Sequence, residues 1–217
     1  MRKKAMVSII LALSGYLVFF GIIIFSFDKE TGRDYQMSHP VSRFYSPGIG
    51  PDRALVVDLP GDAASVRADL IMQAKKTLDI SYYSAEAGQS TDLFWSLLLE
   101  AADRGVRVRV ILDGMANGVM MKQKQALYAL MGHPNIEMKL YEEPNLFIPW
   151  TFNNRLHDKY IIADEDTAIL GGRNISDRFL APDTYKGEIA YNRDVIVDNG
   201  GKDKEASAIQ ELKRYLK

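Results

Sequence analysis

The sequence contains no cysteine and only three histidines. The lack of cysteine excludes disulfide bonds and thiol chemistry, and it is compatible with either side of a membrane. Because there is no H-x-x-x-H or H-E-x-x-H pattern, the chain also lacks a credible cluster of metal ligands, and we expect neither a metal nor a cofactor. The remaining composition, 47% hydrophobic and 25% charged, is typical of a globular protein.

The chain also lacks a strong excess of charge of either sign. Its 217 residues carry 27 basic and 28 acidic side chains, of which five and three precede residue 35, so residues 35–217 retain 22 and 25. A protein that binds nucleic acid through its phosphates normally carries a basic excess. The balance therefore argues against a nucleic-acid partner, although it does not exclude a local basic groove.

One long hydrophobic run stands near the N-terminus, where residues 5–27 contain no charged residue. A helix of this length, at about 1.5 Å per residue, spans a hydrocarbon core of about 30 Å. A cleaved signal peptide usually has a shorter apolar region followed by a small-residue cleavage site, and a buried core helix normally shows a polar stripe. These alternatives fit less well than a retained membrane anchor over residues 1–34.

Charges on the two sides of this run predict its orientation. Three basic residues precede it and a mixture of charges follows it, namely Arg2, Lys3 and Lys4 against Asp28, Lys29 and Glu30. The positive-inside rule then predicts a single-pass protein of the cell membrane, with a cytoplasmic N-terminus and the rest of the chain on the outer side.

Residues 35–53 are polar and rich in proline and glycine, which is typical of a linker. In residues 54–217, strand-like and helical segments alternate, without internal repeats or low-complexity stretches. Predicted strands are 54–59, 78–84, 106–113, 136–142 and 193–198, and predicted helices are 62–77, 90–105, 122–131 and 204–217. We expect Ser90 or Thr91 to cap the second helix and Gly105 to end it. The alternation predicts an α/β sandwich with a mainly parallel sheet.

The stretch HDKYIIADEDTAILGG combines polar groups with a strongly apolar run, and we interpret it as a β-hairpin. Centring the turn between Glu165 and Asp166 places His157 opposite Asn174 and Lys159 opposite Gly172. His157 and Lys159 are two residues apart, so their side chains leave the same face of the strand. In this register an imidazole, an ammonium and a carboxamide converge beside a gap over Gly172 that suits a tetrahedral oxyanion.

These groups suit phosphoryl chemistry without a metal. Lysine and asparagine can donate to phosphate oxygens, and histidine can act as a nucleophile or general acid near neutral pH. An isolated H-x-K is common, and taken alone His157 reads as a strand-end histidine. The full set, His157, Lys159, Asp164, Gly171, Gly172 and Asn174, resembles the H-x-K-x4-D…G-G-x-N signature of the phospholipase D superfamily, with every spacing intact. The segments AADRGVRVRVILDG, GGRNISDRF and NRDVIVD resemble its cardiolipin-synthase-like branch.

The resemblance covers about residues 54–217 and implies a phospholipase D-like α-β-α sandwich. His157 would match the histidine that attacks phosphorus to form a phosphohistidine, and Lys159 and Asn174 would bind the non-bridging oxygens. Asp164 would brace the turn. Asp194 occupies the place of an acid that orients a catalytic histidine, but it equally reads as a solvated strand-end charge. Many relatives carry serine at the position of Gly172, so a phosphate-binding hydroxyl is missing here.

The family's mechanism uses two such motifs, and this chain has one. The other histidines, His39 and His133, read as surface residues. A second half could come from a longer chain, of which this would be the first part, or from a homodimer partner related by a two-fold axis. We favour the longer chain, and we expect an isolated monomer not to complete turnover.

The resemblance and the anchor together suggest a phosphatidyltransferase or phosphodiesterase that acts on membrane phospholipid such as phosphatidylglycerol. The segment NLFIPWTF before the motif could give an apolar lip for acyl chains through Phe147, Trp150 and Phe152, although ordinary core packing explains it as well. Two alternatives stay open: a homodimeric single-motif endonuclease, and an inactive membrane-tethered half-domain.

Overall fold

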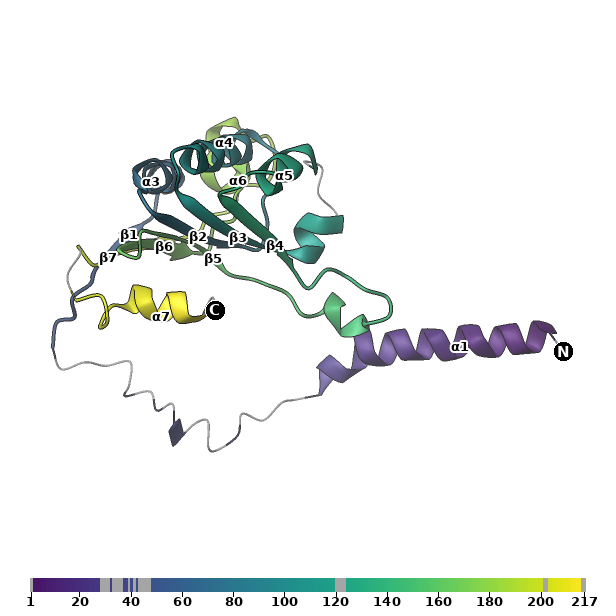
Figure 1. The fold of residues 1–217 in the computed structure, drawn as a ribbon. Helices are drawn as coiled ribbons and strands as arrows, with labels where there is room; N and C mark the ends of the chain where they lie inside the picture. Colours follow the sequence, from purple (N-terminus) through teal and green to yellow (C-terminus); the bar gives the residue numbers. More distant parts are fainter. Residues whose placement is uncertain are drawn as a thin grey trace.

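The computed structural model describes residues 2–27, 32, 37, 38, 40, 42, 48–119, 124–200 and 203–215. Its folded domain is a three-layer sandwich with helices on both faces of a sheet, as predicted (Figure 1). His39 and most of the predicted 35–53 linker lie outside the described residues.

The elements follow the predicted order closely. The strands are β1 (Arg53–Val57), β2 (Thr77–Tyr82), β3 (Arg107–Asp113), β4 (Ile136–Tyr141), β5 (Lys159–Ala163), β6 (Thr167–Gly171) and β7 (Asp194–Asp198). The α-helices are α1 (Arg2–Gly21), α3 (Pro60–Gln73), α4 (Gln89–Asp103), α5 (Lys124–Met131), α6 (Asp177–Leu180) and α7 (Ala208–Tyr215). Short turns are η1 (Ile23–Ser26), a π-helical turn η3 (Met115–Val119), η4 (Pro149–Phe152) and η5 (Pro182–Thr184).

The sheet is mixed, with strand order β1-β7-β6-β5-β2-β3-β4. In the described part of the chain, the pairs β2–β3 and β3–β4 are parallel, and the pairs β2–β5, β5–β6, β6–β7 and β1–β7 are antiparallel. The mixed α/β sheet is therefore confirmed, but the expected predominance of parallel pairing is wrong. The hairpin makes β5 and β6 antiparallel, and the pairs β2–β5, β6–β7 and β1–β7 on both sides of it are antiparallel as well.

The core lies mostly between the sheet and the layer of α3, α4, α5 and α6, while α7 covers the opposite face (Figure 1). Every residue of β5 is buried, which explains why this strand is a continuous apolar run apart from its first residue. Alternate residues of β5 pack on opposite faces of the sheet. Ile161 packs in the larger core, and Tyr160 and Ile162 pack in the smaller cluster with Ile209 of α7.

The start of α4 is capped from a distant part of the chain. The Asp177 carboxylate accepts hydrogen bonds from the backbone N–H groups of Gln89 at 3.1 Å and Ser90 at 2.7 Å, and no side chain at the helix start caps it. The predicted capping by Ser90 or Thr91 is therefore wrong, because α6 supplies the oxygen acceptor. Gly105 follows the helix with φ +90°, as its predicted role requires.

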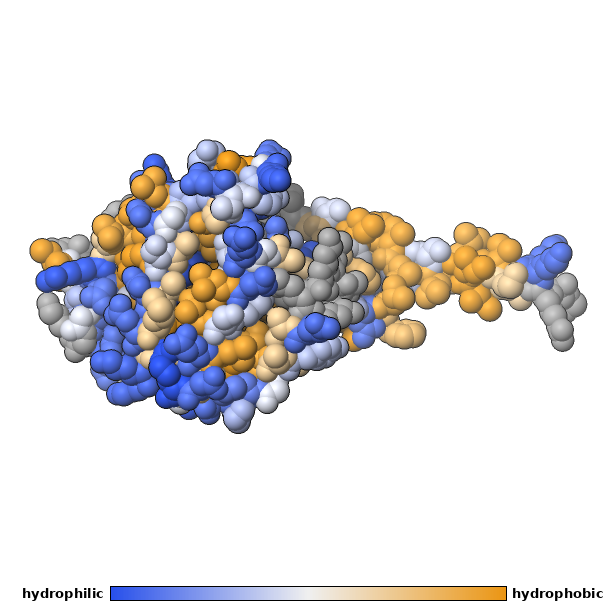
Figure 2. All heavy atoms as spheres, turned by 90° about the horizontal axis from the view of Figure 1, so that it is seen from above, coloured by the Kyte–Doolittle hydropathy of each residue, from blue (hydrophilic) through white to orange (hydrophobic). Residues whose placement is uncertain are grey.

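The N-terminal helix projects away from the sandwich (Figure 1). Residues Lys3–Ser26 form a helix long and apolar enough to cross a membrane, with a mean hydropathy of 2.6, and only 6% of the most apolar window is buried. Figure 2 shows this rod as a nearly continuous apolar surface beside a domain rich in polar patches. Length, composition and exposure thus agree with the predicted anchor.

Candidate active site

The H-x-K motif lies where β5 begins, in the middle of the sheet. Lys159 pairs with Tyr82 at the end of β2, and the backbone N–H of Tyr83 donates to the carbonyl of Asp158 at 3.0 Å. His157 is exposed, whereas Lys159 is buried at 6% exposure. The two side chains are therefore held at the end of β2, with the imidazole open to solvent.

The side chains of His157 and Lys159 both contact the ring of Tyr83. The His157 ring meets it edge to face with centroids 5.0 Å apart, and the Lys159 ammonium lies 5.4 Å from its centroid. The same ammonium donates to the His157 carbonyl at 2.8 Å. Desolvation lowers the pKa of Lys159, and the nearby Asp158 carboxylate opposes the shift. Tyr83 was not singled out from the sequence, because a tyrosine at the end of a buried strand has no distinctive spacing.

The hairpin register differs from the predicted one by a single residue. Tyr160 pairs with Leu170, Ile161 with Ile169, and Ala163 with Thr167, so that the turn is centred on Glu165. Asp164 and Glu165 both adopt positive φ, 52° and 68°, which makes a three-residue loop instead of the predicted two-residue turn. The ladder ends before His157 and Asn174 could face each other, so that predicted pairing is wrong.

Asn174 nevertheless reaches the end of β2 by another route. After β6 the chain leaves the hairpin, and Ile175 forms a parallel bridge with Ala85. The side-chain oxygen of Asn174 accepts a hydrogen bond from the backbone N–H of Ser84 at 3.3 Å. Since Ser84 follows Tyr83, the imidazole, the ammonium and the carboxamide contact two consecutive residues of one strand end.

The two motif glycines lie against the strand β7 rather than beside an open gap. A Cβ atom on Gly171 would approach the Arg193 carbonyl oxygen to 2.5 Å, and one on Gly172 would approach Cγ of Asn192 to 2.9 Å. Both distances are shorter than real Cβ contacts. Gly171 therefore allows a close approach of the backbone at Arg193, whereas a side chain at position 172 would require the Asn192 side chain to move. The predicted oxyanion gap over Gly172 is therefore wrong, because the Asn192 side chain occupies it.

Asp164 lies at the opposite end of β5 from His157. Its carboxylate accepts from the backbone N–H groups of Lys75, Lys76 and Thr77 at 2.8, 2.7 and 2.9 Å. Burial alone would raise the pKa of Asp164, but these donors lower it below its usual value. This placement agrees with bracing: the hairpin turn is fastened to the connection between α3 and β2, away from the imidazole.

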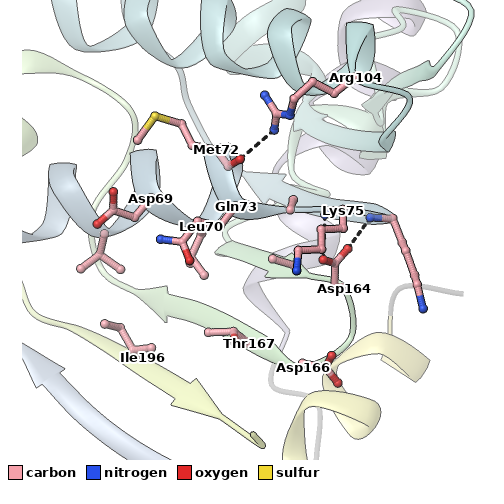
Figure 3. A pocket seen from close by; sticks show the side chains of 14 residues that line it. Asp69, Leu70, Met72, Gln73, Lys75, Arg104, Asp164, Asp166, Thr167 and Ile196 are labelled. Carbon is pink, nitrogen blue, oxygen red and sulfur yellow. Dashed lines mark hydrogen bonds between the residues drawn. The ribbon is translucent and has the colours of Figure 1, made fainter. Parts of the chain in front are cut away.

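A cavity of about 850 Å³ opens at this same end of the hairpin (Figure 3). Its polar lining mixes cations and carboxylates, including Lys75, Arg104, Asp164 and Asp166, and Arg104 is already bonded to the carbonyl at the end of α3. It lies across the length of β5 from His157, and it contains none of the residues of the H-x-K motif.

Asp194 lies in the interior, bonded to two arginines. Its Oδ2 accepts from Arg67 at 3.0 Å and from Arg173 at 2.9 Å, and its Oδ1 accepts from the backbone N–H of Arg173 at 3.4 Å. With 0% exposure it is not a solvated strand-end charge, so that reading is wrong. The described contacts give it a structural ion pair, and its proposed role toward a histidine has no contact here that supports it.

A second buried network orients the segment that leads into the motif. Arg155 donates to both oxygens of Asp113, from Nε at 3.1 and 3.0 Å and from Nη2 at 2.7 Å, and its guanidinium carbon lies 5.2 Å from the Tyr83 ring centroid. Asp113 also accepts from the backbone N–H of Leu156 at 2.9 Å. Burial would raise the pKa of Asp113, but these donors lower it. An acid at the end of the VRVILD strand was the only available signal for this network.

Asn117 of η3 completes the scaffold around the end of β2. Its amide donates to the carbonyls of Tyr83 and Asp113, and its oxygen accepts from the backbone N–H of Ala85 at 3.0 Å. Together with Asn174 it fixes both sides of the Tyr83–Ala85 turn. His133 takes no part, since its imidazole lies 3.1 Å from the Asp103 carboxylate on another surface.

Comparison with known proteins identifies this architecture. The family model described as "Cardiolipin synthase, PLD-like domain" matches residues 68–212, which is more than half of the chain. The chain belongs to the phospholipase D-like family. Within this family it is 35% identical over 128 residues to cardiolipin synthase C of Escherichia coli (strain K12), a match that covers 55% of this chain and 26% of that protein.

Solved structures of phospholipase D-like proteins share the fold. NucT from Helicobacter pylori aligns with a TM-score of 0.54 at 21% identity, over 76% of this chain and 92% of that one. Phosphatidylserine synthase from Haemophilus influenzae aligns with a TM-score of 0.53 at 15% identity, over 75% and 35%. At such identities the likeness concerns the fold alone. The chain spans about a quarter of the length of the cardiolipin synthases it matches.

Proposed function

We propose that this chain is the phosphatidyl-transferring half of a phospholipase D-like enzyme, with His157 as the nucleophile. The observation that carries the proposal is the meeting of an exposed imidazole and a desolvated ammonium on one aromatic ring. Membrane phospholipid, in particular phosphatidylglycerol, is the proposed substrate, because the family match is to cardiolipin synthase and an apolar helix precedes the domain.

In the proposed reaction a nitrogen of His157 attacks phosphorus, an N–P bond forms and the P–O bond to the leaving alcohol breaks. Lys159 and Asn174 bind the non-bridging oxygens, on which charge accumulates in the transition state. The departing alkoxide needs a proton, which a second motif supplies, either from a further half of a longer chain or from a homodimer partner. An acceptor alcohol or water then gives its proton to that second group, and its oxygen attacks phosphorus, so that a new P–O bond forms and the N–P bond breaks.

A substrate with a good leaving group tests the first step without the second motif. Phosphatidyl-p-nitrophenol releases a stabilised phenolate that needs no protonation, so we expect a burst of p-nitrophenolate equal to the amount of protein. His157→Ala should abolish the burst and the acid-labile phosphoprotein, while His133→Ala should retain both. A burst that survives in His157→Ala would overturn the proposal.

Turnover is tested separately with phosphatidylglycerol vesicles and with a plasmid. Cardiolipin or phosphatidic acid formation that depends on His157 supports the lipid substrate. Nicking of the plasmid that depends on His157 would instead assign the same chemistry to nucleic acid. A protein that gives no p-nitrophenolate burst and no turnover of either vesicles or plasmid would be an inactive half-domain.

A further inference from the structure

An exposed apolar loop precedes the motif and packs against the N-terminal helix. We call residues 145–153 the Pro149 loop. Its large side chains face outward, with Leu146 64%, Phe147 85% and Trp150 42% exposed. Such a cluster is not explained by core packing, and on a protein surface it indicates contact with another apolar phase. Phe152, at the end of η4, is half-buried, so it differs from the three exposed side chains.

The loop lies beside the half of the apolar helix that is nearest to the folded domain (Figure 1). The Tyr16 hydroxyl donates to the carbonyl of Phe147 at 3.1 Å, and the Asn153 amide donates to the carbonyl of Gly21. A Cβ atom on Gly21 would lie 3.6 Å from Cβ of Pro149. The apolar surface of the helix therefore continues onto the loop.

A cleft of about 370 Å³ separates the helix end from the loop. It is lined by Phe20, Ile24, Phe25, Trp150 and Asn154. Four of these five side chains are apolar or aromatic, and the cleft is open to the surroundings. Its size and chemistry suit acyl chains that pack between the helix and Trp150.

Several backbone groups of the loop, part of which is the turn η4, are hydrogen-bonded within it. The N–H of Phe147 donates to the Asn145 side chain at 2.9 Å, and the carbonyl of Ile148 accepts from both the N–H and the hydroxyl of Thr151. The carbonyl of Trp150 accepts from Asn153 and Asn154. Irregular backbone at membrane depth requires such pairing, because no water is present to replace it.

The loop is joined directly to the catalytic strand. Arg155, which is bonded to Asp113, follows it by two residues, and His157 by four. Four residues span at most about 14 Å when fully extended. A loop held in the membrane would thus keep the exposed imidazole at the level of phospholipid headgroups.

We propose that the Pro149 loop inserts into the bilayer against the helix Lys3–Ser26, on the side of the membrane that faces the folded domain. Phe147 and Leu146 enter the hydrocarbon, and Trp150 lies at the interface, where its ring has an apolar body and a polar N–H. The inference rests on the proposed membrane anchorage and on the proposed lipid substrate. It assigns the loop a partner, which is a phospholipid surface. It also assigns the loop a role, which is to set the distance of the active site from the bilayer.

Depth-dependent quenching tests the inference independently of catalysis. The chain has no cysteine, so single cysteines at Phe147, Leu11 and Leu93 can each carry one environment-sensitive fluorophore. Leu11 lies in the apolar helix, and Leu93, which is 57% exposed on α4, is the matched control on the domain surface. The full chain is reconstituted in phosphatidylglycerol vesicles that contain lipids with a quencher on the acyl chain.

We expect the probes at Phe147 and Leu11 to be quenched several-fold more than the probe at Leu93. Quenching at Leu11 without quenching at Phe147 overturns the loop insertion and leaves the anchor intact. Equal, weak quenching at all three positions overturns both the anchor and the loop. Neither result depends on turnover, so the p-nitrophenolate burst decides the proposed chemistry separately.

Discussion

The guanidinium of Arg173 and the carboxylate of Asp194 lie 2.9 Å apart in the interior, where at most 1% of either side chain is exposed. Arg173 is the variable residue of the G-G-x-N motif, so the motif strand is joined to β7 by a buried charge pair. A second arginine, Arg67 of α3, shares the same carboxylate oxygen and also donates to the Tyr82 hydroxyl at 3.0 Å. This cluster connects the helical layer, the sheet and the residue before Asn174.

Asp194→Asn is expected to destabilise the fold strongly. The substitution leaves two buried guanidinium groups without a counter-charge, and breaking a buried pair in this way costs about 3–5 kcal/mol. Urea denaturation followed by circular dichroism measures the loss. Asp183→Asn, at an exposed position, is the matched control and should change stability by less than about 0.5 kcal/mol. A normally stable Asp194→Asn protein with a slower burst would instead favour a role toward histidine.

Asp164→Asn is expected to lower stability in a pH-dependent manner. The pKa of Asp164 is lowered in the folded state, because three backbone N–H donors outweigh the effect of burial. Its contribution is therefore complete above the unfolded pKa of about 3.9 and is lost as the pH falls through the folded value. We expect a difference of about 1 kcal/mol at pH 7, since the group is half-exposed and such bonds are partly screened. The difference should shrink below about pH 4, and a constant difference down to pH 2 would contradict the assignment.

Lys159→Met is expected to separate catalysis from stability. Removal of one preformed donor to a transition-state oxygen typically slows a reaction by about 10²–10³-fold, so the p-nitrophenolate burst should slow by that order. The burial that lowers the pKa of Lys159 also opposes its charge, so the methionine variant should be as stable as the parent or more stable at neutral pH. As the pH rises, Lys159 loses its proton and the burst rate of the parent protein should fall. Because the pKa of Lys159 is lowered, this fall should begin at a lower pH than for an unperturbed lysine. If the burst of Lys159→Met slows only as far as its loss of folded protein explains, Lys159 has a structural role alone.

Arg155→Lys tests whether the Asp113 network positions the nucleophile. The guanidinium binds both carboxylate oxygens, and a lysine cannot reproduce that fork. We expect the burst rate to fall by about tenfold, which corresponds to about 1.4 kcal/mol of positioning, with little change in the urea midpoint. Arg107→Lys, at an exposed position on β3, should leave the burst unchanged. An unchanged burst in Arg155→Lys would exclude a positioning role for this network.

The sequence was sufficient to predict most helices and strands, but not the hairpin register or the contacts between distant segments. Hydrophobic patterns and the interpreted hairpin predicted the seven strands and the longer helices within a few residues, because burial dictates such patterns, whereas the short helix α6 was not predicted. The hairpin register failed because it depends on loop length: positive φ at Asp164 and Glu165 adds one residue to the turn, and no residue type there demands it. The residue types of the motif marked His157 and Lys159, but the ring of Tyr83 that joins them belongs to a strand far away in the chain.

Asn192 imposes a packing constraint on the motif glycine Gly172. Its side chain lies where a larger residue at position 172 would have to go, and its Cβ is 3.2 Å from the place of a Cβ on Gly172. A serine at position 172 would therefore meet this side chain, which would have to move or be replaced by a smaller one. Positions 172 and 192 are thus coupled by packing.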